Sequence, residues 1–300
     1  MISGETASIL PPLMALGVLA LFTSMVAPAV DPRRWPLAID LSRQGLVFGA
    51  LGLAVIFYFF RSDPVLAGVI VGAIMLHEYG HVLAFRLAGH PRPVFRLAPL
   101  GGVAFSDRAP RSQAENAYIA LMGPGFSLAL IVALLLLAWM TRETEVERAA
   151  RLLVDGGRSV SEIALLAAGV VGALNFFNLL PFYPLDGGRT LKAAASAAGH
   201  SVAANAAIIM SVALALLAFF VLQSLLLLFF ALIGLALAKQ EEAIDRALEP
   251  MSRGTAALTT AAYLATTVAH GAAALPLAQE VVRSLQPPLA QTESPAQTER

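Results

Sequence analysis

Residues 65–88 read VLAGVIVGAIMLHEYGHVLAFRLA, an apolar stretch that carries two histidines and a glutamate in its second half. A run of this kind is typical of a helix that crosses a membrane, which needs about 20 mostly apolar residues. Each ionisable side chain inside a membrane costs about 2.5 kcal/mol or more, so three of them together indicate a functional site. The interpretation of the whole chain therefore starts from His77, Glu78 and His81.

The composition also indicates a membrane protein. Of the 300 residues, 58% are hydrophobic and 13% are charged, whereas a soluble domain is about 45–50% apolar and about 25% charged. The 20 basic and 20 acidic residues cancel, and no motif for binding nucleic acid is visible, so we expect no nucleic-acid partner. The chain has no cysteine, so disulfides are excluded and any metal must be held by nitrogen or oxygen atoms.

The apolar runs predict an all-α polytopic membrane protein with about seven transmembrane helices. Gln223-Ser224 near the middle of 203–238 predicts a tight turn between two of them. The first run lacks a preceding basic region, so we interpret it as a retained span and not as a cleaved signal peptide. The expected spans are 9–28, 44–60, 65–88, 116–140, 161–180 and the two halves of 203–238.

Two further segments have less regular patterns. Residues 255–279 are rich in alanine and threonine and could form an eighth span or an amphipathic helix on the surface, of which we favour the surface helix. Residues 94–105, VFRLAPLGGVAF, are rich in strand-forming residues. They could form a hairpin that turns at the two glycines, one bent strand, or an amphipathic loop on the membrane.

His77 and His81 are four residues apart, so on a helix they lie on one face, one turn apart. Two imidazoles at this spacing can bind one zinc ion at about 2.0–2.1 Å. Glu78 points to the side, where it can contact a water molecule on the metal without being a ligand. This is the HExxH arrangement of metalloproteases, for which a chance match is expected only about 0.004 times in such a chain. The alternative is a chance cluster of polar residues, which the membrane setting disfavours.

A catalytic zinc site usually has three protein ligands and one open position. Asp186 is the candidate third ligand, in an irregular stretch with two prolines and two glycines just after the span 161–180. This span and 65–88 run in the same direction, so HEYGH and Asp186 are expected near the same membrane face. Three other histidines lie in loops or near segment ends and are interpreted as surface residues: His90, His200 and His270.

Two motifs together, HEYGH (77–81) and NLLPFYPLDGG (178–188), resemble those of the site-2 protease family of intramembrane zinc metalloproteases. The stretch PLGGVAF (99–105) looks like the membrane-associated loop of that family, and MGPGF (122–126) looks like its Gly-Pro motif. The resemblance is strongest to the compact bacterial branch of the family. It covers about residues 44–240.

The resemblance implies roles for five residues. His77, His81 and Asp186 would bind one zinc ion, Glu78 would be the catalytic base, and Asn178 would lie beside the reacting carbonyl group. The substrate would be the transmembrane segment of another protein, and the lipid bilayer would be the other partner. The alternatives are a membrane metal transporter or sensor, a catalytically inactive protease-like scaffold, and a membrane metalloprotease that acts on prenylated C-termini.

The expected organisation follows from this core. Residues 1–43 form an extra transmembrane helix and loop, 44–240 the intramembrane metalloprotease core, 241–285 a C-terminal helical region and 286–300 a disordered tail. Basic residues in the loops place the active site nearer the cytoplasmic face of a bacterial inner membrane. The four arginines of the 141–160 loop argue against this orientation.

Overall fold

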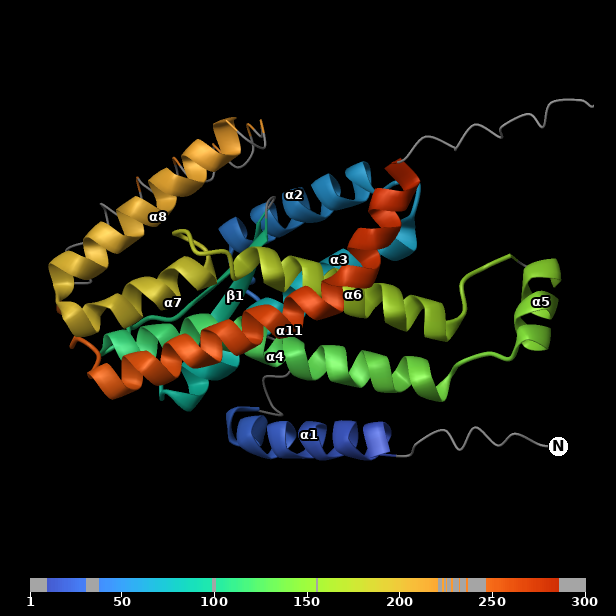
Figure 1. Cartoon of the computed structure of the whole chain (residues 1–300), viewed down its shortest axis with the longest axis horizontal. Coiled ribbons are helices and arrows are strands. Elements are labelled where there is room, and N and C mark those ends of the chain that lie inside the picture. The colour runs from blue at the N-terminus through green and yellow to red at the C-terminus, as the bar shows by residue number, and fades with distance from the viewer. Residues whose placement is uncertain are drawn as a thin grey trace, which may run out of the picture.

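The computed structural model describes residues 10–30, 38–98, 101–154, 156–220 and 247–285, and the single residues 223, 225, 228, 232 and 236. The described chain is mostly helical and has one small sheet (Figure 1). The elements are α1 (Leu10–Val26), α2 (Arg43–Phe59), α3 (Pro64–Leu87), β1 (Val94–Ala98), β2 (Gly101–Phe105), α4 (Gln113–Met140), α5 (Glu145–Val154), α6 (Val160–Asn178), α7 (Asp186–Ala195), α8 (His200–Phe220) and α11 (Arg253–Leu285).

The mostly helical fold with one small sheet is confirmed, whereas the count of seven spans is not. In the described part of the chain, five helices are long and apolar enough to cross a membrane, namely α1, α3, α4, α6 and α11, and the apolar helices α2 and α8 are shorter. At the turn predicted in 203–238, α8 is described as far as Phe220, and Gln223 has φ 48°, a left-handed conformation that does not continue a helix. The helix expected after this turn and the tail 286–300 lie largely outside the described residues.

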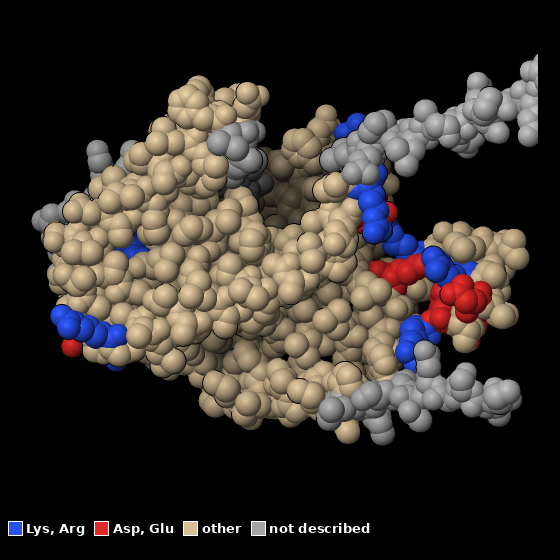
Figure 2. All heavy atoms as spheres, in the orientation of Figure 1, with Lys and Arg blue, Asp and Glu red and all other residues tan. Residues whose placement is uncertain are grey.

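The surface of the protein suits a membrane. Large apolar side chains are exposed along the helices, for example Leu16, Phe59 and Leu264. On the face shown in Figure 2, most charged side chains gather at the end of the molecule where α5 lies. The long helices therefore present apolar flanks, and the charges lie near their ends.

The interior is built by α3, α4 and α6, and α11 runs along α6 and α4 (Figure 1). Apolar residues of all four helices meet in one cluster, which includes Ala73, Ile131, Val171 and Leu277. The choice between a surface helix, which we favoured, and an eighth span for 255–279 stays a prediction: α11 has the length and composition of a span and packs against the core.

An ion pair joins the first turns of α3 and α6. Asp63 caps α3 by accepting a hydrogen bond from the Leu66 N–H at 3.0 Å, and Arg158, just before α6, lies 2.7 Å from its carboxylate. The hydrogen bond from Arg158 lowers the pKa of Asp63 to about 2, so the carboxylate stays ionised at neutral pH. Because both partners precede their helices, α3 and α6 start at the same end, as their expected parallel direction requires.

The segment 94–105 contains the antiparallel strand pair of the hairpin alternative, but the prediction that it turns at the two glycines was wrong. Val94 pairs with Phe105 and Ala98 pairs with Gly101, so Gly101 and Gly102 belong to β2. The edge of β1 that faces away from β2 is covered by the segment before α2. The Phe95 N–H donates to the Ala38 carbonyl and the Phe95 carbonyl accepts from the Asp40 N–H, both at 2.7 Å. In an antiparallel pair, residues whose N–H and C=O groups face the partner strand alternate with residues whose groups face away. Phe95 faces away from β2, so its partner Ala104, and likewise Gly102 two residues earlier, direct their N–H and C=O groups to the outer edge of β2.

Candidate metal centre

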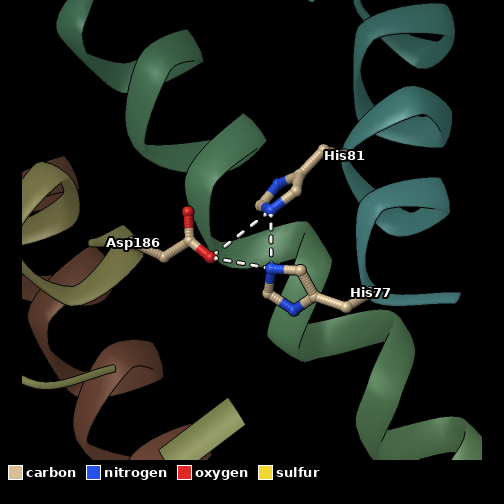
Figure 3. Close-up of side chains that lie close together, drawn as sticks. All are labelled: His77, His81 and Asp186. Carbon is tan, nitrogen blue, oxygen red and sulfur yellow. Dashed lines mark hydrogen bonds and ion pairs between the residues drawn. The ribbon is translucent and has the colours of Figure 1, made fainter. Parts of the chain in front are cut away.

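Three buried side chains converge at the centre of the bundle (Figure 3). The Nε2 atoms of His77 and His81 lie 3.1 Å apart, and the Asp186 Oδ2 lies 3.2 and 3.3 Å from them. His77 and His81 come from the second half of α3, and Asp186 is the first residue of α7. The structure thus brings together the three residues that the sequence predicted as metal ligands.

The spacing of these atoms fits a small tetrahedral cation. Bonds of about 2.0–2.1 Å in a tetrahedron place neighbouring ligand atoms about 3.3 Å apart. The three separations of 3.1, 3.2 and 3.3 Å match this value. Two imidazoles and one carboxylate form a donor set that zinc accepts readily, and three protein ligands leave its fourth position open.

The outer nitrogens of both histidines are held by buried oxygens. The His77 Nδ1 lies 2.7 Å from the Asn175 Oδ1, and the His81 Nδ1 lies 2.7 Å from the Ile119 carbonyl oxygen. These oxygens can only accept, so each Nδ1 carries the proton and each Nε2 presents a lone pair to the centre. Lone pairs and a carboxylate oxygen repel one another at such short distances unless a cation lies between them, so the arrangement fits a metal.

Glycines make room for the ligands. A Cβ atom at Gly123 in α4 would overlap the His81 ring and lie 2.9 Å from His77 Cε1. A Cβ atom at Gly187 would overlap the Leu179 carbonyl group at the end of α6. The two glycine-containing motifs therefore have a packing role: Gly123 lets α4 lie against the histidines, and Gly187 lets the start of α7 fold back on α6.

Glu78 is buried beside the centre and lies under the outer edge of the hairpin. Its side chain is so close to β2 that a Cβ atom at Gly102 would lie 2.7 Å from both Cδ and Oε1. The backbone of Ala104 also faces the Glu78 carboxyl group. The edge of β2 that has no strand partner in the described chain therefore passes directly over Glu78.

The second oxygen of Asp186 faces a cation. Arg189, one turn later in α7, lies 4.0 Å from the Asp186 Oδ1 and donates a hydrogen bond of 3.1 Å to the Asn116 side chain of α4. Asp186 thus directs one oxygen to the two histidines and the other towards a guanidinium group that α4 holds in place.

Two asparagines near the end of α6 differ in their relation to the centre. Asn178, predicted to lie beside the reacting carbonyl, is half-buried, and no hydrogen bond joins it to the three ligands in the described structure. Asn175 is fully buried and supports His77, while its amide donates to the Val171 carbonyl at 2.8 Å. The sequence analysis missed Asn175, although a polar residue inside an apolar span is a signal of function.

Two of the three remaining histidines are not surface residues, and that prediction was wrong for them. His90 is buried and lies 2.6 Å from the Glu115 carboxylate. His270 is fully buried because α11 packs on α4 and α6, which the sequence of α11 alone could not reveal. His200 is half-buried at the start of α8.

Comparisons with known proteins agree with this centre. The model of a family described as peptidase family M50 matches residues 65–222. The chain is 30% identical over 121 residues to Zinc metalloprotease MJ0392 of Methanocaldococcus jannaschii, an alignment that covers 40% of this chain and 31% of that protein. The chain thus matches about a third of the length of this curated relative. Because the family match exceeds half of the chain and contains every residue of the metal centre, the chain belongs to peptidase family M50, the site-2 protease family, and is a metalloprotease.

Proposed function

We propose that this metalloprotease uses one zinc ion, bound by His77, His81 and Asp186, to hydrolyse peptide bonds in or near the transmembrane segments of other membrane proteins. One observation carries the proposal: the three ligands and Glu78 are buried inside a bundle of helices that have the length and composition of membrane spans. A substrate that reaches this centre from the bilayer would be a membrane protein. Such cleavage is regulated intramembrane proteolysis.

The chemistry divides between the metal and two side chains. Zinc, when bound, supplies a Lewis acid that polarises a carbonyl group and makes a water molecule more acidic. Glu78 is the general base that takes the proton from the attacking water and later returns it to the leaving amine. Asn178 donates an amide N–H to the oxyanion that develops on the scissile carbonyl. His77 and His81 keep their Nδ1 protons throughout, because each Nδ1–H donates a hydrogen bond, to the Asn175 Oδ1 and the Ile119 carbonyl oxygen respectively.

The hairpin offers a way to hold the substrate. A transmembrane helix hides its carbonyl groups in hydrogen bonds, so the substrate must unwind locally before it is cut. An unwound segment can add to the outer edge of β2 by backbone hydrogen bonds, which do not depend on its side chains. Because this edge passes over Glu78, a segment bound there would have its peptide bonds beside the base.

Proline at Ala104 tests this mode of binding. We expect Ala104→Pro to bind a full equivalent of zinc and to lower kcat/KM for a transmembrane substrate about tenfold, since a hydrogen bond contributes about 0.5–1.5 kcal/mol. A higher KM is the effect of the lost strand pairing, and a lower kcat accompanies it because the Ala104 N–H also bonds the Glu78 carboxyl group. The control is Val103→Pro, because the Val103 N–H points towards Arg96 inside the hairpin. It should mainly lower the melting temperature. An unchanged KM in a folded Ala104→Pro variant would contradict strand addition, and a fall in kcat alone would indicate disturbance of Glu78.

The location of the protein is also a proposal. We place it as a multi-pass protein in a bacterial inner membrane, with the metal centre nearer the cytoplasmic face, from the distribution of basic residues. Residues 107 and 144 flank α4 and are both exposed. In the cysteine-free chain, the variants Asp107→Cys and Thr144→Cys should react with an impermeant reagent from opposite sides of the membrane. The cysteine at position 107 should react from the cytoplasm. If it reacts from the outside, the orientation of the protein in the membrane is the reverse of the one proposed.

The function itself is tested in membranes. We compare by quantitative proteomics the membranes of cells that produce the wild-type protein or Glu78→Gln. At least one protein with a transmembrane segment should accumulate at full length in the variant, and its shortened form should be present only with the wild type. If the two sets of membrane proteins are the same while purified wild-type protein cuts soluble peptides, the substrate is not a transmembrane segment.

A further inference from the structure

Helix α11 lies outside the region that matches the family, 65–222, yet it contributes two buried polar side chains beside the metal centre. We propose that α11 is a brace for the metal ligands, and that Tyr263 and His270 are positioning residues of the zinc site. The inference rests on the zinc site proposed above. It does not depend on which substrate is cut.

Tyr263 holds the junction between α6 and the loop that leads to Asp186. Its ring is buried, and its hydroxyl donates a hydrogen bond of 2.8 Å to the Leu179 carbonyl oxygen. The same carbonyl group is in direct contact with the backbone of Gly187, the residue after Asp186. The Leu179 N–H in turn bonds the Asn175 carbonyl at 2.9 Å. Through the backbone of Leu179, Tyr263 is therefore linked to Asn175, which supports His77. Through the same backbone it is linked to Gly187, which follows Asp186.

His270 holds the turn of α4 that lies against the two histidines. It is fully buried, and its Nε2 lies 3.0 Å from the Pro124 carbonyl oxygen, which can only accept. Pro124 lies inside α4 and has no N–H, so the helix lacks one of its own hydrogen bonds at this turn. Gly123, the preceding residue, is in contact with the rings of His77 and His81. The bond from His270 thus fixes the backbone on which both ligand rings rest.

Close packing fixes the position of α11 along α6. A Cβ atom at Gly172 would lie 2.8 Å from the Ala274 nitrogen, and one at Gly169 would lie 3.0 Å from Leu277. On the other side, a Cβ atom at Gly271 would lie 3.3 Å from the Phe176 ring. With so little room between the two backbones, α11 cannot slide along α6, so Tyr263 and His270 stay opposite their acceptors.

Zinc affinity of the purified full-length protein tests the brace. We would measure it by competition with a fluorescent chelator, and we would measure the melting temperature of the metal-free protein in parallel. Tyr263→Phe and His270→Leu should each weaken zinc binding about tenfold, as loss of an outer support does in metal sites. His270→Gln, which keeps an N–H donor, should stay within about threefold of the wild type, whereas a space-filling role alone would not distinguish Gln from Leu.

The matched control is His200→Leu, because His200 also bonds a backbone carbonyl, that of Leu248 at 3.1 Å, but not at the centre. Wild-type zinc affinity in both Tyr263→Phe and His270→Leu would overturn the proposal, as would an affinity of His270→Gln no better than that of His270→Leu. If His270→Leu does not fold, Tyr263→Phe and His270→Gln decide. Because metal affinity is measured, failure of the brace and failure of the proposed proteolysis are distinguishable.

Discussion

Glu78→Gln is expected to bind one zinc ion per chain and to cleave no detectable substrate. Glutamine has nearly the same shape as glutamate but cannot accept the proton of the attacking water, while His77, His81 and Asp186 remain. General base catalysis contributes about 10²–10⁴-fold, so the rate should fall by at least that range. Zinc content and cleavage of a transmembrane substrate are measured on the same purified preparation.

The control for this variant is Glu280→Gln, which changes an exposed carboxylate on α11 and should leave cleavage unchanged. Near-normal cleavage by Glu78→Gln would show that another group is the base. If neither the wild type nor the variant cleaves any peptide while both bind zinc, a metal transporter or an inactive scaffold becomes the better interpretation of the same ligands.

Asp186→Ala is expected to lose zinc as well as cleavage. The substitution removes one of three ligands and leaves two imidazole nitrogens 3.1 Å apart with no carboxylate beside them. Changes to residues that only support the ligands lower metal affinity by up to about 100-fold. Loss of a ligand should lower zinc affinity by more than that. Metal content after dialysis against a chelator, compared with that of Glu78→Gln, separates the loss of a ligand from the loss of a base.

Asp107→Ala, which removes an exposed carboxylate in the loop before α4, is the matched control and should keep its zinc. A full equivalent of zinc in Asp186→Ala would mean that another residue completes the site. Glu78, which is buried beside the centre, is the alternative that we would test, and the double variant Glu78→Gln/Asp186→Ala would then lose the metal.

The convergence of His77, His81 and Asp186 could be predicted because their pattern is local or has strong chemical constraints. The spacing of His77 and His81 fixes both on one helical face, and the prolines and glycines around Asp186 mark an irregular segment where a ligand can leave the helix. Asn175 and His270 could not be assigned in the same way. Their roles depend on which residues of α3 and α4 lie opposite them, and helix rotation and register are set by packing of the whole bundle.

The span count shows a similar limit. Hydropathy predicted α1, α3, α4 and α6 as spans, but for 255–279 it favoured a surface helix, although α11 also has the length and composition of a span. Alanine and threonine give this segment a weak apolar signal. The same small side chains allow α11 to approach Gly169 and Gly172 of α6 closely, so the helix is held by contact with protein and not by hydropathy alone.

The supports of the metal centre have a thermodynamic consequence. The ligands come from α3 and α7, and their hydrogen-bond partners come from α4 and α6, so one ion would connect four helices at a single point. An ion that binds only the assembled bundle stabilises it by about 2.7 kcal/mol when its free concentration is 100 times its dissociation constant. Metal supply would then set the lifetime of the folded protein in the membrane as well as its activity, and starvation for zinc would remove the enzyme through quality control.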